Sequence, residues 1–393
     1  MMSSRIKRVT AALLLLSLSF LFLAGCWDSR TIEDQLILTG IAIDVTDQPG
    51  QISITAQVAN TKKNKNGSAE NNNEAIVLQA TGDSLMTCLT EMDRDSGQRL
   101  LFPHNQIRLL GIEMAKQGIQ RHLDLSMRDQ KARFEVPIAI VDGRGEEALI
   151  AKLSEMPISG VLLGNLFEAQ SGISSQYQVR LIDFVHRILD DPAAPAIPMI
   201  QVTGQEEQRE IKIVGMAVFQ RDKMVGRLTS DESLGYIFSF GNVKKCNISV
   251  FDDSSKAGLH IATLDCKRAI ALEPDGGVSI SLTIHAVANV NEIYGFDKIE
   301  PTELLQHLEY LAQEEIKNKI ANCLSVAQSL DADIFCFSTM LKKKYPKQWN
   351  EIKNRWSELF ADLDLNMDVT VRIPETGQIV RSLKMEEWEE NHK

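Results

Sequence analysis

The chain has 393 residues, of which 44% are hydrophobic, and a formal net charge of −11 at neutral pH. The 53 acidic residues outnumber the 42 basic ones, which argues against nucleic-acid binding because that depends on neutralising phosphate charge. A chain of this length exceeds what one hydrophobic core usually supports, so we expect two or three domains.

The N-terminus has the layout of a bacterial lipoprotein signal. A basic head precedes an apolar run from residue 9 to residue 23, which is shorter than the roughly 20 residues that span a bilayer as a helix. The run ends on Leu23-Ala24-Gly25-Cys26, a lipobox, in which the cysteine accepts a diacylglyceryl group. We therefore predict a signal peptide at residues 1–25 and lipid attachment at Cys26. An uncleaved anchor helix and a plain secretory signal are the alternatives.

Strands and helices alternate through the first part of the mature chain. Apolar periodicity predicts strands at 35–44, 51–59, 75–80, 107–110 and 134–141. It predicts helices after Asp83, at 113–127 with a weak point or break at Gly118, and at 146–153. Residues 60–73 are polar and rich in asparagine, so we expect a mobile loop there. The alternation suggests a mixed sheet with helices packed on it.

The middle of the chain predicts helices followed by a break. Residues 156–191 have mostly helical periodicity. The three prolines in 191–198 exclude a helix interior, since proline lacks an N–H donor, so this segment is a candidate linker or domain edge. Strands are expected next at 211–220 and 223–228.

The last third has the longest regular patterns. A strand at 278–290 alternates apolar and polar residues, and it pairs most simply with 259–272 through the Asp-Gly turn at 273–277. A further strand is expected at 363–373. Between them, a helix begins at Pro301 and carries one apolar stripe over roughly 45 Å. These elements predict a two-layer α+β domain.

Recognised catalytic and metal-binding patterns are not found. There is no H-E-x-x-H, G-x-S-x-G, P-loop or dinucleotide-binding motif, so we predict no catalytic residue, no cofactor and no metal site. The histidines have simpler interpretations as partly buried or exposed rings at His122, His285 and His307, and as a surface pair of His186 with Asp183. Asp44, Asp47 and Asp129 could each be argued into a site, but chance explains them in a chain with so many acidic residues.

Five cysteines follow Cys26, an odd number without regular spacing. This does not suggest a disulfide framework, and buried free thiols are the simplest expectation. The five are Cys88, Cys246, Cys266, Cys323 and Cys336. A bridge between Cys246 and Cys266 stays open as the main exception.

A series of short motifs runs along nearly the whole mature chain: CWDSR at 26–30, LTGIAID at 38–44, FPHN at 102–105, GIEMAKQGI at 111–119, GMAVF at 215–219, DKMVG at 222–226, DIF at 333–335 and YPKQW at 345–349. In this order they resemble the Ger(x)C family, the lipoprotein C subunits of bacterial spore germinant receptors. The chain departs from the family where glycines are expected, around Cys336 and Ser338, so the turn or close packing there is expected to differ.

The resemblance implies an α+β protein of three mixed α/β domains, the last a largely antiparallel sheet on a long amphipathic helix. We place the domains at 26–153, 154–245 and 246–381. It also implies a non-enzymatic, lipid-anchored subunit at the outer face of the spore inner membrane. Its partners would be the membrane-embedded A and B subunits of a receptor that responds to nutrients, while a direct small-molecule ligand stays undefined.

Two other classes of protein share the lipobox. A solute-binding lipoprotein of a transporter is the main alternative, but it would normally have two doubly wound lobes, whereas the last third here predicts an antiparallel sheet. A lipid-anchored hydrolase would need a nucleophile or metal constellation that the sequence does not contain.

Overall fold

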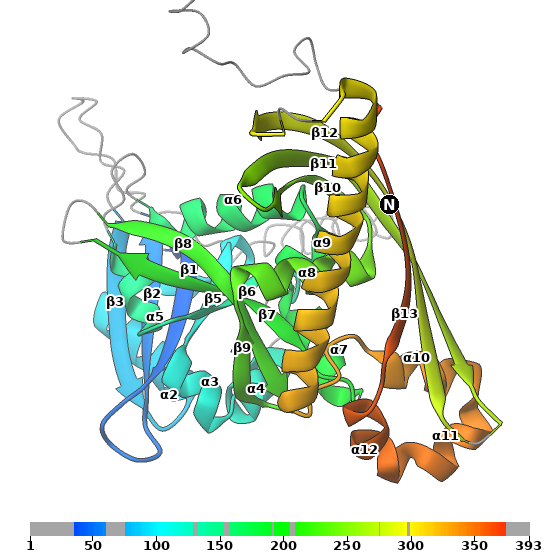
Figure 1. Ribbon diagram of the computed structural model, residues 1–393. Helices are drawn as coiled ribbons and strands as arrows, with labels where there is room; N and C mark the ends of the chain where they lie inside the picture. Colours follow the sequence, from blue (N-terminus) through cyan, green and yellow to red (C-terminus); the bar gives the residue numbers. More distant parts are fainter. Residues whose placement is uncertain are drawn as a thin grey trace, which may run out of the picture.

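The computed structural model describes residues 35–59, 75–128, 133–151, 158–190, 192–204, 209–274, 276–296 and 299–374. These residues form two β-sheets with helices packed on them, so the expected mixture of α and β structure is confirmed (Figure 1). The predicted signal peptide, Cys26, the 60–73 loop and Asp129 lie outside the described residues.

A nine-stranded mixed sheet occupies the first part of the chain, in the order β3-β2-β1-β5-β6-β7-β8-β9, with β4 also paired to β1. Strands β1, β5, β6 and β7 run parallel to one another, and antiparallel pairs complete both sides. The strands are β1 (Gln35–Val45), β2 (Ile52–Ala59), β3 (Ala75–Gly82), β4 (Arg99–Leu101), β5 (Ile107–Gly111), β6 (Ile138–Val141), β7 (Ala196–Thr203), β8 (Glu210–Gln220) and β9 (Lys223–Leu228).

Helices cover both faces of this sheet because parallel neighbours need crossover connections. The helices are α2 (Leu85–Ser96), α3 (Ile112–Gln117), α4 (Gln120–Arg128), α5 (Gly145–Ile150), α6 (Ser159–Ser171) and α7 (Leu181–Leu189). Helices α2, α3, α4 and α7 share one apolar cluster with the strands, which includes Met114 and Phe184. Helices α5 and α6 close a second cluster through Leu149, Leu163 and Phe167.

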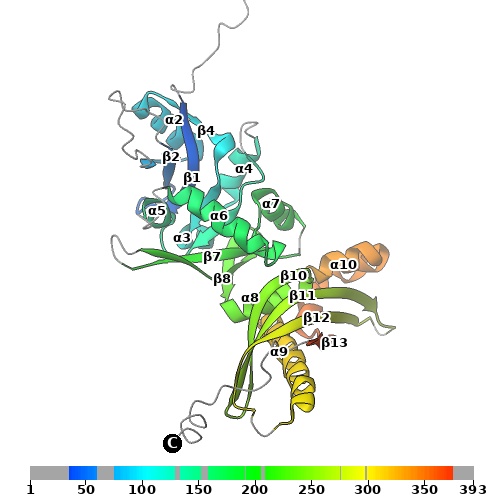
Figure 2. The same cartoon turned by 90° about the horizontal axis from the view of Figure 1, so that it is seen from above.

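A four-stranded sheet in the order β10-β11-β12-β13 forms the last third (Figure 2). Strands β10 (Val243–Asp252), β11 (Ser255–Leu272) and β12 (Val278–Tyr294) are antiparallel, and the predicted hairpin between 259–272 and 278–290 is found. Strand β13 (Leu365–Arg372) is parallel to β12 because the 29-residue helix α9 (Pro301–Ser329) lies between them in the chain. Helix α9 buries Leu308, Ile316 and Ile320 in the same cluster as the sheet.

Strand β8 joins the two halves of the protein through alternate side chains. Ala217 and Phe219 pack into the cluster beneath α7, whereas Met216 and Val218 pack into the cluster of the C-terminal half. Because successive side chains of a strand point to opposite faces, one strand contributes to both cores. The two halves therefore share a continuous apolar contact.

The predicted linker at 191–198 is wrong in its second half. Residues from Ala196 onward belong to β7, which pairs with β6 on one side and β8 on the other. Pro198 is tolerated because β7 pairs with β6 only at Met199 and Ile200, so no ladder donor is needed from the proline. Strands from 35–153 and from 196–228 lie in one sheet, and the division into three domains stays a prediction.

Several elements were not predicted from the sequence. They include strands β4, β7 and β10 and the helices α8 (Ser230–Phe240), α10 (Phe337–Lys344), α11 (Pro346–Ile352) and α12 (Trp356–Ala361). Helix α8 has a capping box formed by Thr229 and Glu232, a local signal that the apolar periodicity alone does not contain. The three later helices are short, so tertiary packing decides whether they form.

Gly226 lies within β9. Its φ is outside the left-handed region, but the position is crowded. A Cβ at this position would lie 2.5 Å from Leu330 Cδ1 at the end of α9. We expect Gly226→Val to destabilise the fold by about 1–3 kcal/mol, measured by chemical denaturation.

His285 provides the control for this substitution. Its side chain is exposed on the outer face of β12, so His285→Ala should change stability by less than about 0.5 kcal/mol. Equally small losses from both variants would contradict the close approach of β9 to α9.

Candidate functional site

The predicted lipid-attachment residue, Cys26, lies outside the described ranges, so the structure does not test it. Among the residues that the structure describes, no helix combines the length and apolar character needed to cross a membrane. Within the same ranges, no three His, Cys, Asp or Glu side chains gather as metal ligands would.

The candidate histidines lie apart from one another. His285 faces outward opposite Asp265 and Thr370 on the neighbouring strands. His307 is partly buried, and its Nε2 lies 2.7 Å from Asp252 Oδ2. These positions assemble no common site.

The expected surface pair of His186 and Asp183 is wrong. Both oxygens of Asp183 instead accept hydrogen bonds from Arg180, at 2.7 and 3.0 Å. The planar guanidinium group matches a carboxylate with two parallel bonds, which an imidazole cannot do.

All five described cysteines are free thiols. Cys246 pairs with Ile261 and Cys266 with Ile284, so the two do not face each other in the sheet. Burial raises the pKa of Cys88, Cys246 and Cys266 to about 11. These thiols are therefore protonated at neutral pH and poorly reactive.

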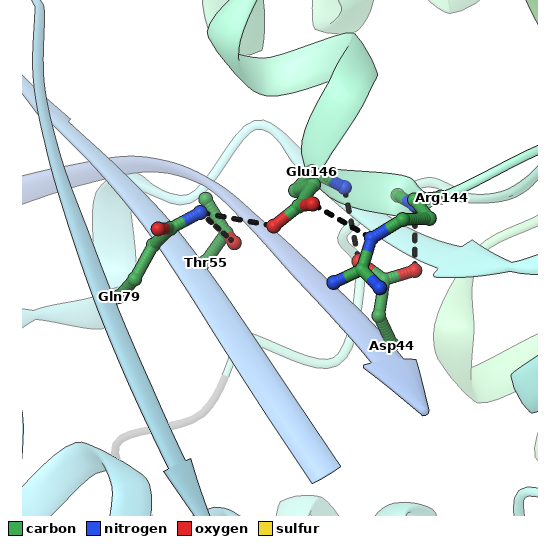
Figure 3. Close-up of polar contacts among 6 residues, drawn as sticks. Asp44, Thr55, Gln79, Arg144 and Glu146 are labelled. Atoms are coloured by element: carbon green, nitrogen blue, oxygen red, sulfur yellow. Dashed lines mark hydrogen bonds and ion pairs between the residues drawn. The ribbon is translucent and has the colours of Figure 1, made fainter. Parts of the chain in front are cut away.

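The polar network around Asp44 joins the large sheet to α5 (Figure 3). Asp44 is 2% exposed near the end of β1, and its two carboxylate oxygens accept hydrogen bonds from the N–H groups of Gly145 (2.7 Å) and Glu146 (3.0 Å). Arg144 Nε donates to Glu146 Oε1 at 2.6 Å, and Gln79 Nε2 donates to Glu146 Oε2 at 3.0 Å.

This network fastens a helix rather than presenting reactive groups. The Asp44 carboxylate satisfies two N–H groups that the first turn of a helix leaves unpaired. Burial raises the pKa of Asp44, although these two hydrogen bonds oppose that rise. A Cβ at Gly111 would lie 2.1 Å from Asp44 Oδ1, so the end of β5 closes the space beside the carboxylate. Asp44, interpreted from the sequence as a chance acid, is therefore a structural cap.

We expect Asp44→Asn to destabilise the protein by about 2 kcal/mol in chemical denaturation. The amide has one acceptor oxygen, so one buried N–H loses its partner and meets an NH₂ group. Asp47→Asn is the matched control, because Asp47 is exposed in the turn after β1 and should change stability by less than about 0.5 kcal/mol. Similar effects for the two variants would exclude a capping role for Asp44.

A second polar site lies where the two halves meet, at the segment 331–338, which includes the start of α10. The N–H of Ala194 donates to the backbone oxygen of Asp333 at 3.0 Å. The Asp333 side chain is 2% exposed, and it accepts from the N–H groups of Phe337 (3.0 Å) and Ser338 (2.8 Å). One residue therefore both caps α10 and fixes it to the chain just before β7.

Arginine and aromatic side chains fill the same junction. Arg187 of α7 donates to the hydroxyl of Tyr236 in α8 at 2.6 Å. The guanidinium of Arg268 lies 4.5 Å from the ring centre of Phe240 and 5.2 Å from that of Phe337. Cation–π contacts of this kind gain strength when solvent is excluded. No periodic signal in the sequence points to this cluster, because its members come from distant elements.

Cys336 keeps the turn that a glycine would favour. Its φ is 57°, in the left-handed region, and it precedes the first residue of α10. A non-glycine residue adopts this conformation at a cost of about 1–2 kcal/mol. The expected difference in turn or packing from the family around Cys336 stays a prediction.

Two family models match successive parts of the chain. Residues 28–202 match the spore germination protein N-terminal domain, and residues 214–377 match the C-terminal model described as spore germination B3/GerAC like. The junction at 331–338 belongs to the second region and contacts the end of the first.

Whole-length relatives agree with these matches. Spore germination protein YndF of Bacillus subtilis is 23% identical, over 96% of this chain and 99% of the relative. Spore germination protein KC of the same organism is 21% identical, over 95% and 97%. The crystal structure of the GerBC protein has the same fold, with a TM-score of 0.57 at 17% identity over 86% of this chain and 97% of that one. The chain belongs to the Ger(x)C family, and its role is in spore germination.

Proposed function

We propose that the protein is a lipid-anchored, non-enzymatic subunit of a nutrient germinant receptor at the outer face of the spore inner membrane. One observation carries this proposal: the N-terminal family model begins at residue 28, two positions after the lipobox cysteine. A thioether-linked lipid on Cys26 would hold the folded part close to the bilayer surface. The acidic chain needs such an anchor because anionic headgroups repel it.

The subunit works by contact with the membrane-embedded A and B subunits. The polar groups around Asp44 and Asp333 support a non-enzymatic role, because they are occupied by hydrogen bonds that maintain the fold. The two halves share the β8 contact, so the protein presents one continuous body to its partners.

Affinity capture of the tagged full-length protein from detergent-solubilised spore membranes tests the proposal. We expect two other membrane proteins to copurify in constant ratio, one of them transporter-like and the other with several membrane spans. Untagged spores treated identically provide the control. Copurification of an ATP-driven transporter instead would favour a solute-binding lipoprotein, and recovery of the protein alone in mild detergent would contradict a receptor subunit.

A further inference from the structure

A basic segment at α10 and α11 contrasts with the acidic chain around it. Residues 342–355 contain six basic side chains and one acidic one, whereas acidic residues outnumber basic ones in the chain as a whole. Four of the six, Lys342, Lys343, Lys344 and Lys347, are exposed at the end of α10 and the start of α11, and we call these four the basic ridge. Helix α10 lies on the outer side of the molecule in both views (Figure 1, Figure 2).

Half of the basic ridge has no carboxylate partner. Lys342 Nζ lies 3.0 Å from Asp190 Oδ1, and Lys344 Nζ donates to a backbone oxygen of β11 at 2.6 Å. Within the described parts of the chain, no ion pair involves Lys343 or Lys347. Lysines in the last turn of α10 stabilise that helix end, but Lys347 lies in the first turn of α11, where the helix dipole disfavours a cation. Helix stability therefore does not account for the whole ridge.

An exposed leucine lies beside the basic ridge. Leu189, the last residue of α7, is 76% exposed. The next residue, Asp190, accepts hydrogen bonds from Thr339 Oγ1 at 2.7 Å and from Lys342 Nζ at 3.0 Å, which holds the end of α7 against α10. Lysines combined with an exposed leucine are typical of surfaces that lie among lipid headgroups, because the cations meet phosphate while the apolar side chain enters the acyl boundary.

The basic ridge is fixed to both halves of the protein. Asp333 caps α10, and its backbone oxygen accepts from the N–H of Ala194 just before β7. The bonds between Asp190 and α10 add a second connection to the first half. A surface that contacts the ridge therefore orients the folded body as a whole.

The predicted tether keeps this surface near the bilayer. Gln35, the first residue of β1, is nine positions after Cys26. Nine residues span at most about 30 Å when fully extended. A lipid on Cys26 would therefore hold the folded part close to the headgroups. Anionic headgroups attract the ridge and repel acidic surfaces, and this attraction acts over about 10 Å at moderate ionic strength.

We propose that the basic ridge, together with Leu189, binds the anionic headgroups of the membrane and so fixes which side of the protein faces the bilayer. This inference rests on the proposed lipid anchoring for its biological setting. The lipid chains supply the attachment, and the ridge supplies the orientation. Its own attraction is weak and sensitive to salt, because a few exposed cations on an acidic chain do not hold a protein at a membrane.

The orientation is tested with full-length lipidated protein in vesicles of one part phosphatidylglycerol to three parts phosphatidylcholine. A fluorophore on Leu189→Cys should be quenched by lipids that carry a spin label at the headgroup, and high salt should relieve the quenching. The same fluorophore on Asp47→Cys is the control, because Asp47 follows the end of β1 that lies away from the tether. Unsubstituted protein treated identically corrects for labelling of other thiols.

Charge variants measure the ridge without the lipid. The mature chain beginning at Trp27 should bind the anionic vesicles weakly at low salt, and Lys343→Gln with Lys347→Gln should lower this binding about 30-fold. Arg209→Gln with Lys212→Gln is the matched control, since it removes the same charge at the start of β8 and should change the binding little. Pure phosphatidylcholine vesicles should bind none of these proteins.

The outcomes separate the ridge from the anchor. The proposal is overturned if the Leu189 fluorophore is quenched no more than the Asp47 one, or if neutralising Lys343 and Lys347 leaves vesicle binding unchanged. If these two substitutions instead reduce copurification of other membrane proteins, the ridge binds a protein and its assignment to lipid is wrong. Release of the lipidated protein from phosphatidylcholine vesicles would contradict the lipid anchor, while the binding of the non-lipidated chain would still decide the role of the ridge.

Discussion

A protein whose native leader is replaced by an ordinary secretory signal, so that the mature chain begins at Trp27, should lose stable membrane attachment and nutrient-triggered germination. Each buried CH₂ group contributes about 0.8 kcal/mol, yet a single myristoyl chain binds only marginally. A diacylglyceryl group on Cys26 supplies two chains at one point. The acidic residues outnumber the basic ones, so electrostatic attraction to anionic lipids should not replace them.

Membrane fractionation and nutrient response of the spores measure this effect. The simpler variant Cys26→Ala is less informative, because it also blocks removal of the leader, which can itself hold the protein at the membrane. The control carries the exchanged signal with the lipobox and Cys26 restored, and it should regain both properties. Full membrane retention and normal germination without the lipid would show that partner subunits suffice as the anchor.

Gly235→Ala should destabilise the C-terminal half by about 3 kcal/mol or more. In a helix, alanine is normally preferred to glycine by about 1 kcal/mol. Here a Cβ would lie 2.0 Å from the backbone oxygen of Lys319 and 3.0 Å from the nitrogen of Ile320. Helices α8 and α9 cross so closely that only a residue without a side chain fits, and the added methyl group must force them apart.

Chemical denaturation of the purified protein measures this loss, and Gly50→Ala is its control. Gly50 has a φ of 80° in the turn between β1 and β2, and nothing lies within 4 Å of the position that an added methyl group would occupy. Strain alone should cost about 1 kcal/mol there. If Gly235→Ala is no more destabilising than Gly50→Ala, the close crossing of α8 and α9 is wrong.

The shared β8 strand limits how far the two halves of the protein can move relative to each other. A contact that is continuous with both hydrophobic cores resists independent motion of the two halves, unlike a small polar interface.

The sequence alone determined the features that depend on residues close together in the chain. The lipobox at Cys26 is a local motif, and the β11–β12 hairpin follows from apolar alternation and an Asp-Gly turn. The position of α9 follows from Pro301 and a long apolar stripe. Periodicity specifies such elements because helices and strands present one face at a fixed spacing.

Only the tertiary structure decided which of these elements meet. Asp44 caps a helix that begins about 100 residues later, and the backbone oxygen of Asp333 accepts a hydrogen bond from the N–H of Ala194 across a longer separation. Pro198 lies in strand β7 because neighbouring residues of that strand pair with β6 and β8. The presence of proline had predicted a linker at this position. The physical reason is that burial, close backbone approach and unpaired donors arise between distant segments, and no spacing within one segment encodes them.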